Sequence, residues 1–149
     1  MSLANHFTGE KRRTAIQFLK YGVVGVMNTA ITLIVIFLCK SVFGVNEYVS
    51  NAIGYVAGLV NSFLWNRRWV FNSHGGLSHQ ALHFLLGFCI CYALQFLVVW
   101  LINQSWFGEK EFLLLGFWTI SGYGVATLVG NVAYTLFNFA YNRLVTFKD

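Results

Sequence analysis

Two arginines occupy the same position in a short element that occurs twice in the chain. The element reads F-x-x-N-R-x-x-x-F over residues 63–71 and again over residues 139–147, and its fifth residue is Arg67 or Arg143. A guanidinium group presents a planar fork of donors that matches the oxygens of a phosphate. The recurrence therefore predicts phosphate binding by Arg67 and Arg143, with Arg68 beside them. Ordinary basic flanking of an apolar segment explains the arginines equally well, but not Asn and two Phe at the same spacing.

A second group of candidate residues consists of uncharged polar side chains within apolar segments. In hydrocarbon each of these side chains must find a hydrogen-bond partner, and such residues usually face the interior of a helix bundle. These side chains are compatible with two roles. The amides either bond one helix to another, at about 0.6 kcal/mol per contact, or line a polar groove that admits a hydroxyl-rich headgroup. The set is Asn28, Thr29, Asn51, Asn61, Gln95, Asn131 and Asn138.

Enzyme chemistry finds little support in the remaining residues. The apolar segments contain no Asp or Glu, so they hold neither an acid–base pair nor the carboxylate that couples small exchangers to protons. His79 and His83 have an i, i+4 spacing that suits a metal, but no third ligand lies nearby in the sequence. The three cysteines form no metal-binding or disulfide pattern. We therefore expect no catalytic residue, no metal and no cofactor.

The composition points to a membrane protein. Of the 149 residues, 57% are hydrophobic and 10% are charged, whereas soluble domains carry about 25% charged residues. The net charge of +5 would be compatible with nucleic-acid binding. However, the basic residues lie at the ends of apolar segments, where they would meet lipid headgroups. We therefore expect no nucleic-acid partner.

Four apolar segments are long enough to cross a bilayer, which requires roughly 20 residues per helix. They lie at about 18–40, 48–66, 81–103 and 119–141. Residues 112–118 precede the fourth segment and are interpreted as an interfacial segment or an extension of that helix. Residues 1–149 thus form a single all-α integral membrane domain. With the N-terminus in the cytoplasm, eight Lys and Arg residues lie inside and two outside, which favours both termini inside.

The second and fourth segments are copies of each other. A shift of 76 positions places Gly54 on Gly130 and superimposes the two F-x-x-N-R-x-x-x-F elements, whereas the first and third segments match far less well. We infer two helical hairpins related by parallel duplication. Both copies carry small residues at every fourth position, which allows close helix packing within one chain or in a homodimer. These stripes are Ser50, Gly54, Gly58 and Ser62, and Gly122, Ala126 and Gly130.

Taken in order along the chain, these motifs resemble those of the GtrA-like family of small four-span membrane proteins. The resemblance runs from about Phe18 to Phe147. It rests on Gly25-x-x-Asn28-Thr29, on Gly54-x-x-x-Gly58, on Ser62-Phe63-x-x-Asn66-Arg67-Arg68-Trp69-Val70-Phe71, and on Asn138-Phe139-x-x-Asn142-Arg143-x-x-x-Phe147.

The resemblance implies flipping of an undecaprenyl-phosphate-linked sugar across the bacterial inner (cytoplasmic) membrane, for O-antigen or another cell-envelope polysaccharide. It also implies membrane glycosyltransferases as partners, and it allows a rival role as a non-transporting adaptor that anchors those enzymes. For the flippase, Arg67 and Arg143 would hold the phosphate with help from Arg68 and Lys20. The sugar would meet a polar groove, and two interfacial aromatic residues would stack on the sugar or anchor the helix. The groove residues are Asn28, Asn61, Asn138, Asn66 and Asn142, and the aromatic residues are Trp65 and Trp69.

Overall fold

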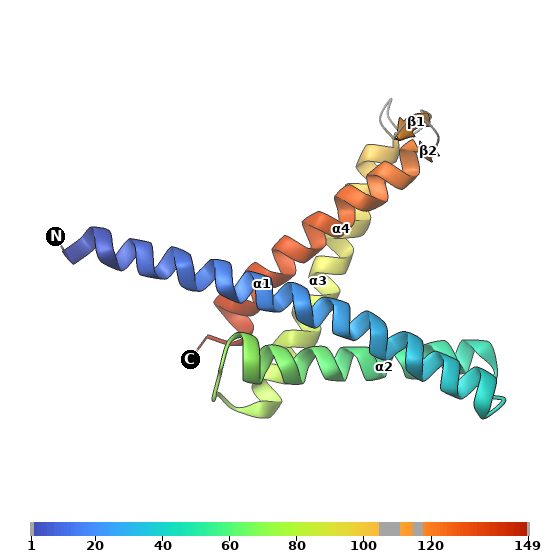
Figure 1. The fold of residues 1–149 in the computed structure, drawn as a ribbon, viewed down its shortest axis with the longest axis horizontal. Coiled ribbons are helices and arrows are strands. Elements are labelled where there is room, and N and C mark those ends of the chain that lie inside the picture. Colours follow the sequence, from blue (N-terminus) through green and yellow to red (C-terminus); the bar gives the residue numbers. More distant parts are fainter. Residues whose placement is uncertain (1, 105–110, 115–117, 149) are drawn as a thin grey trace. The chain divides into compact units, whose positions relative to one another are not determined.

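The computed structural model describes residues 2–104, 111–114 and 118–148, and the chain divides into two compact units after Gly75. Each unit is a helical hairpin. In the first, α1 (Ser2–Phe37) continues through the π-helical turn η1 (Leu38–Val42), and α2 (Glu47–Trp65) continues through η2 (Asn66–Val70). Figure 1 shows α1 and α2 side by side along much of their length.

The turn between α1 and α2 is short and locally stabilised. Gly44 has a φ of 66°, a backbone conformation that glycine adopts without steric cost. Asn46 caps α2, and its side chain accepts a hydrogen bond from Tyr48 N at 2.9 Å. Across the turn, Lys40 Nζ lies 3.1 Å from Glu47 Oε2 in an exposed ion pair. These contacts hold the two helices antiparallel.

The second unit contains two helices and, between them, a pair of strands. α3 (Leu77–Gln104) precedes β1 (Glu111–Leu114) and β2 (Trp118–Ser121), and α4 (Gly122–Tyr141) continues through η3 (Asn142–Thr146). The strands are antiparallel, with Glu111 opposite Ser121 and Leu114 opposite Trp118. Figure 1 shows them at one end of the α3–α4 hairpin. The Ser121 hydroxyl then caps α4 by accepting from Gly124 N at 3.1 Å.

These strands correct one part of the sequence prediction. The extension of the fourth helix over residues 112–118 is wrong for the described positions, since residues 111–114 and 118–121 are extended and α4 begins at Gly122. Residues 115–117 lie outside the described part of the chain. Thr119 and Ile120 are β-branched and favour an extended backbone, and the Ser121 cap fixes the helix start. An interfacial position for this segment stays a prediction.

Glycines bring the two helices of each hairpin together. A Cβ atom on Gly54 would lie 2.5 Å from Ile36 Cγ1 and 3.0 Å from the backbone oxygen of Thr32. A Cβ on Gly130 would lie 2.6 Å from Val99 Cγ2. Both contacts are too close for any side chain larger than hydrogen. At these positions the small-residue stripes therefore pack within one chain, and a homodimer stays a prediction.

The same contacts extend the internal repeat to the odd-numbered helices. Ile36 faces Gly54 as Val99 faces Gly130, so α1 corresponds to α3 at an offset of 63 residues, whereas α2 corresponds to α4 at 76. The difference lies in the connection, which is longer in the second hairpin and contains β1 and β2. This is why the first and third segments matched poorly at a single shift. At the offset of 63, buried Gln17 corresponds to buried Gln80.

Much of the helix surface is apolar and faces outward. Val26 on α1 is 72% exposed and Phe96 on α3 is 68% exposed. Two helical stretches, Gly9–Val42 and Leu77–Gln104, are long and apolar enough to cross a membrane. Exposed apolar surface of this extent is typical of a lipid-facing protein, because a soluble one would bury it.

Candidate functional site

Both F-x-x-N-R-x-x-x-F elements fold into the same wide turn at the end of an even-numbered helix. Phe71 N donates to Asn66 O, and Phe147 N donates to Asn142 O, each at 2.9 Å and each across five residues. Asn66 is 1% exposed and Asn142 is fully buried. Such π-helical turns are rare and occur frequently at functional sites. The two elements thus share one backbone geometry, which η1 also adopts without an Asn or an Arg.

The side chain of each buried Asn reaches back by one helical turn. Asn66 Nδ2 donates to Ser62 O at 2.8 Å and to Ser62 Oγ at 3.2 Å. Asn142 Nδ2 donates to Asn138 Oδ1 at 3.2 Å. Ser62 and Asn138 thus serve as equivalent acceptors, although they differ in type. Within the described residues, the Oδ1 atoms of Asn66 and Asn142 are buried without a hydrogen-bond partner, so each presents an acceptor.

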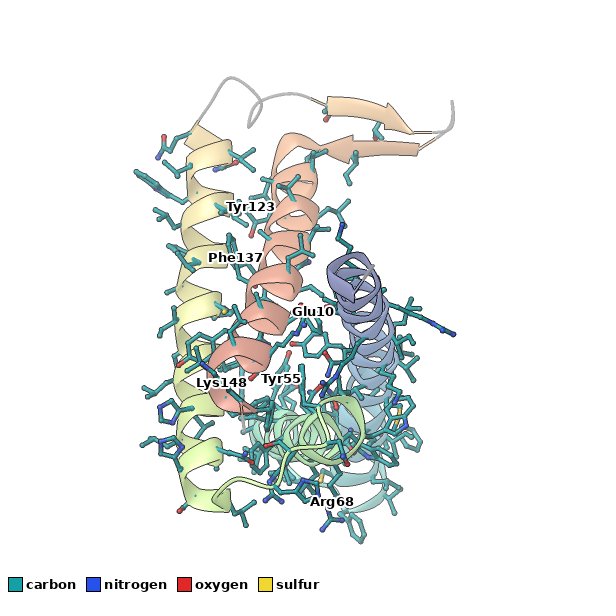
Figure 2. All side chains as sticks on the ribbon, turned by 90° about the vertical axis from the view of Figure 1, so that its left-hand side faces the viewer. Glu10, Tyr55, Arg68, Tyr123, Phe137 and Lys148 are labelled. Carbon is teal, nitrogen blue, oxygen red and sulfur yellow. The ribbon has the colours of Figure 1, made fainter. Side chains whose placement is uncertain are left out.

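The arginines of the two elements are the second residues of the turns, directly after the buried Asn. Arg67 in η2 and Arg143 in η3 are half-buried, whereas Arg68 is exposed. Arg67 Nη2 donates to Gly75 O at 2.9 Å, and Arg67 O accepts from Ser73 N at 2.9 Å. Arg67 therefore has a structural role, because its bonds hold the segment that follows η2 in place. This role is separate from the predicted binding of a phosphate. Figure 2 labels Arg68 at the η2 end of the first hairpin.

Lys20 joins this end of the first hairpin from α1. Its Nζ lies 5.2 Å from the centre of the Trp69 ring and 3.4 Å from Trp69 O. Trp69 in turn makes an edge-to-face contact with Trp65, with ring centres 6.1 Å apart. The structure thus brings Lys20 next to the element that carries Arg67 and Arg68. A cation over an indole ring is attracted electrostatically, so the tryptophans also help to place the lysine.

The predicted groove residues form local pairs within each hairpin. Asn61 Nδ2 donates to Asn28 Oδ1 at 2.6 Å and links α2 to α1. In the second hairpin Gln95 Nε2 donates to Asn131 Oδ1 at 2.7 Å and links α3 to α4. Asn138 lies with Asn142 and the Tyr134 hydroxyl, 3.3 Å from its Nδ2. The bond between Asn28 and Asn61 matches the helix-to-helix reading of these amides.

We expect the Asn28–Asn61 bond to contribute measurably to the stability of the first hairpin. A double-mutant cycle with Asn28→Ala and Asn61→Ala should give a coupling free energy of about 0.6 kcal/mol, measured by reversible unfolding in mixed micelles. Asn51→Ala paired with Asn28→Ala is the control, because Asn51 bonds within its own helix to Glu47 O. Equal coupling in the two cycles would contradict a specific bond between α1 and α2.

Two buried amides were missed by the sequence reasoning. Gln17 is 8% exposed and Gln80 is 2% exposed, and Gln17 Oε1 has no hydrogen-bond partner among the described residues. A search for repeats that allows connections of unequal length would have paired these two positions. His79 and His83 lie with ring centres 4.1 Å apart. In residues 2–104, 111–114 and 118–148, no group of three potential metal ligands occurs.

Two helical hairpins with outward apolar faces, including two helices long enough to span a bilayer, are typical of an integral membrane protein. The family model for the GtrA/DPMS transmembrane domain matches residues 20–147, and the chain belongs to this family. This confirms the resemblance noted from the motifs. A search of curated proteins finds no match. Family membership ties the chain to polyprenyl-phosphate sugar metabolism, in a family of typically non-catalytic membrane domains.

Proposed function

We propose that this protein flips a polyprenyl-phosphate-linked sugar across the bacterial inner membrane, without catalysing a reaction. The observation that carries the proposal is the repeated Asn–Arg turn, with a buried Asn and a half-buried Arg at the end of each hairpin. If the arginines only flanked the apolar helices, neither the buried Asn nor the defined turn would be required. Duplicated membrane hairpins with sites between the repeats are also common in transporters.

In the proposed topology the four helices span the membrane and both termini lie in the cytoplasm. Both Asn–Arg turns then lie at the cytoplasmic surface, where Lys and Arg residues favour anionic headgroups. Arg67 and Arg143 would bind the phosphate of the lipid. Lys20 and Arg68 would add positive charge, and Trp65 and Trp69 would anchor the first hairpin at the interface.

The sugar would then cross along polar groups while the polyprenyl chain stays in the bilayer. Asn28, Asn61 and Asn138 would exchange their present bonds for bonds to sugar hydroxyls, and the buried oxygens of Asn66 and Asn142 would accept from hydroxyls near the phosphate. The apolar segments carry no carboxylate, which favours movement down a gradient over proton coupling. A homodimer or a lipid-facing groove would shelter the sugar during this movement.

The proposal is tested with the purified protein alone in liposomes. The probe is a polyprenyl-phosphate glucose, and periodate, which does not cross the membrane, oxidises only the sugar in the outer leaflet. We expect the protected inner fraction to disappear much faster than in protein-free liposomes. Equal rates, with folded and inserted protein, would contradict an unaided flippase.

An adaptor for membrane glycosyltransferases is the alternative. The bond between Asn28 and Asn61 favours it, because amides that bond to each other are adequately explained by helix packing. An adaptor predicts that Asn28→Ala and Asn138→Ala leave glycosylation in cells unchanged and that a transferase co-purifies with the protein. A flippase predicts that the same substitutions reduce glycosylation although the transferase is still present.

A further inference from the structure

The second hairpin contains a cavity that the proposed phosphate site does not use. Its volume is about 240 Å³, and it lies between the C-terminal part of α3 and the start of α4. Four aromatic side chains and two amides contribute to its wall: Tyr92, Phe96, Trp100, Tyr123, Gln95 and Asn103. Figure 2 labels Tyr123 near the end of α4 that adjoins the strands.

The position of the cavity suits an amphipathic ligand at a membrane surface. Asn103 lies in the last turn of α3, and Tyr123 is the second residue of α4. The cavity is therefore at the opposite end of the hairpin from η3 and its Arg143. In the proposed topology this end faces the outer leaflet, where a flipped headgroup would arrive.

The lining has the chemistry of a sugar site. Aromatic faces pack against the C–H face of a pyranose ring, and amides offer both a donor and an acceptor to neighbouring hydroxyls. The Gln95 amide is held in place, because its Nε2 donates to Asn131 Oδ1 at 2.7 Å. An acyl chain would use only the apolar part of this wall. Pockets for drug-sized ligands begin at roughly 300 Å³, so the cavity accommodates a ligand of about one ring.

We propose that this cavity binds the single hexosyl ring of the lipid-linked sugar at the outer leaflet. The proposal rests on the flippase function and adds to it a second site, which binds the sugar and not the phosphate. Tyr123 and Trp100 would stack on the ring, and Gln95 and Asn103 would bond to its hydroxyls. Recognition of the sugar and recognition of the phosphate would thus be located at opposite ends of the second hairpin.

The test measures binding and not transport, so that it can fail or succeed independently of the flippase assay. The full protein in nanodiscs is titrated with citronellyl-phosphate glucose and, separately, with citronellyl phosphate. Tyr123→Ala should weaken binding of the glucose-bearing probe about five- to tenfold and leave binding of citronellyl phosphate unchanged. Tyr123→Phe, which keeps the ring, should stay within about twofold of the native protein.

Tyr55→Ala is the matched control, because Tyr55 is a similarly exposed helical tyrosine in the first hairpin, at 68% against 59% for Tyr123. We expect it to bind both probes as the native protein does. The proposal is overturned if the glucose adds no affinity, if Tyr55→Ala loses as much affinity as Tyr123→Ala, or if decane displaces the glucose-bearing probe. Sugar-dependent binding without flipping would support the cavity and contradict only the flippase.

Discussion

Alanine at both Arg67 and Arg143 is expected to slow transbilayer movement of polyprenyl-phosphate glucose at least about a hundredfold. Hydrogen bonds to charged groups contribute roughly 1.5–3 kcal/mol each, and each 1.4 kcal/mol is a factor of ten. Loss of two such contacts to one phosphate therefore exceeds two factors of ten. The measurement is the initial rate of periodate accessibility in liposomes with equal amounts of inserted protein.

The control removes the same charge elsewhere. Arg12 and Arg13 are exposed on α1 and lie outside the repeated element, so Arg12→Ala with Arg13→Ala should leave the rate within about twofold of the native rate. Because Arg67 also bonds to Gly75 O, melting and gel filtration must show that the double variant is folded. Lysine at both positions keeps the positive charge but lacks the planar pair of donors of a guanidinium group. This variant should therefore give an intermediate rate of transbilayer movement. A folded alanine variant with the native rate would contradict the phosphate site.

Leucine at Gly54 is expected to destabilise the first hairpin by at least about 1–3 kcal/mol, the usual cost of overpacking. A single added Cβ already lies 2.5 Å from Ile36 Cγ1 and 3.0 Å from Thr32 O. The Thr32 oxygen belongs to the helix backbone, so it cannot move aside as a side-chain end does. The measurements are the melting temperature in detergent and the yield of monodisperse protein.

The matched variant for this test is Gly22→Leu on α1. A Cβ at Gly22 meets no described heavy atom within 4 Å, and leucine is a better helix former than glycine. We expect Gly22→Leu to melt at or above the native temperature. If the melting temperature of Gly54→Leu equals that of Gly22→Leu, the close approach of α1 and α2 at Gly54 is not what stabilises the hairpin.

The sequence by itself determined the chemical class of this protein and the approximate positions of its apolar helices. Apolar segments about as long as a bilayer is thick, with few charges, leave lipid as the only suitable solvent for much of the surface. The repeated F-x-x-N-R-x-x-x-F element was also visible, because its residue types and spacing recur at one offset. These are local properties, which composition and spacing encode directly.

Only the tertiary structure decided which polar groups meet. Asn28 and Asn61 are 33 residues apart, and their bond depends on how closely Gly54 and Gly58 let α2 approach α1. The cavity beside Tyr123 likewise depends on how α3 and α4 pack against each other. The second offset, 63 residues for Gln17 and Gln80, was hidden by the longer connection that contains β1 and β2. Contacts between distant residues depend on backbone approach and loop length together, and no single spacing in the sequence encodes both.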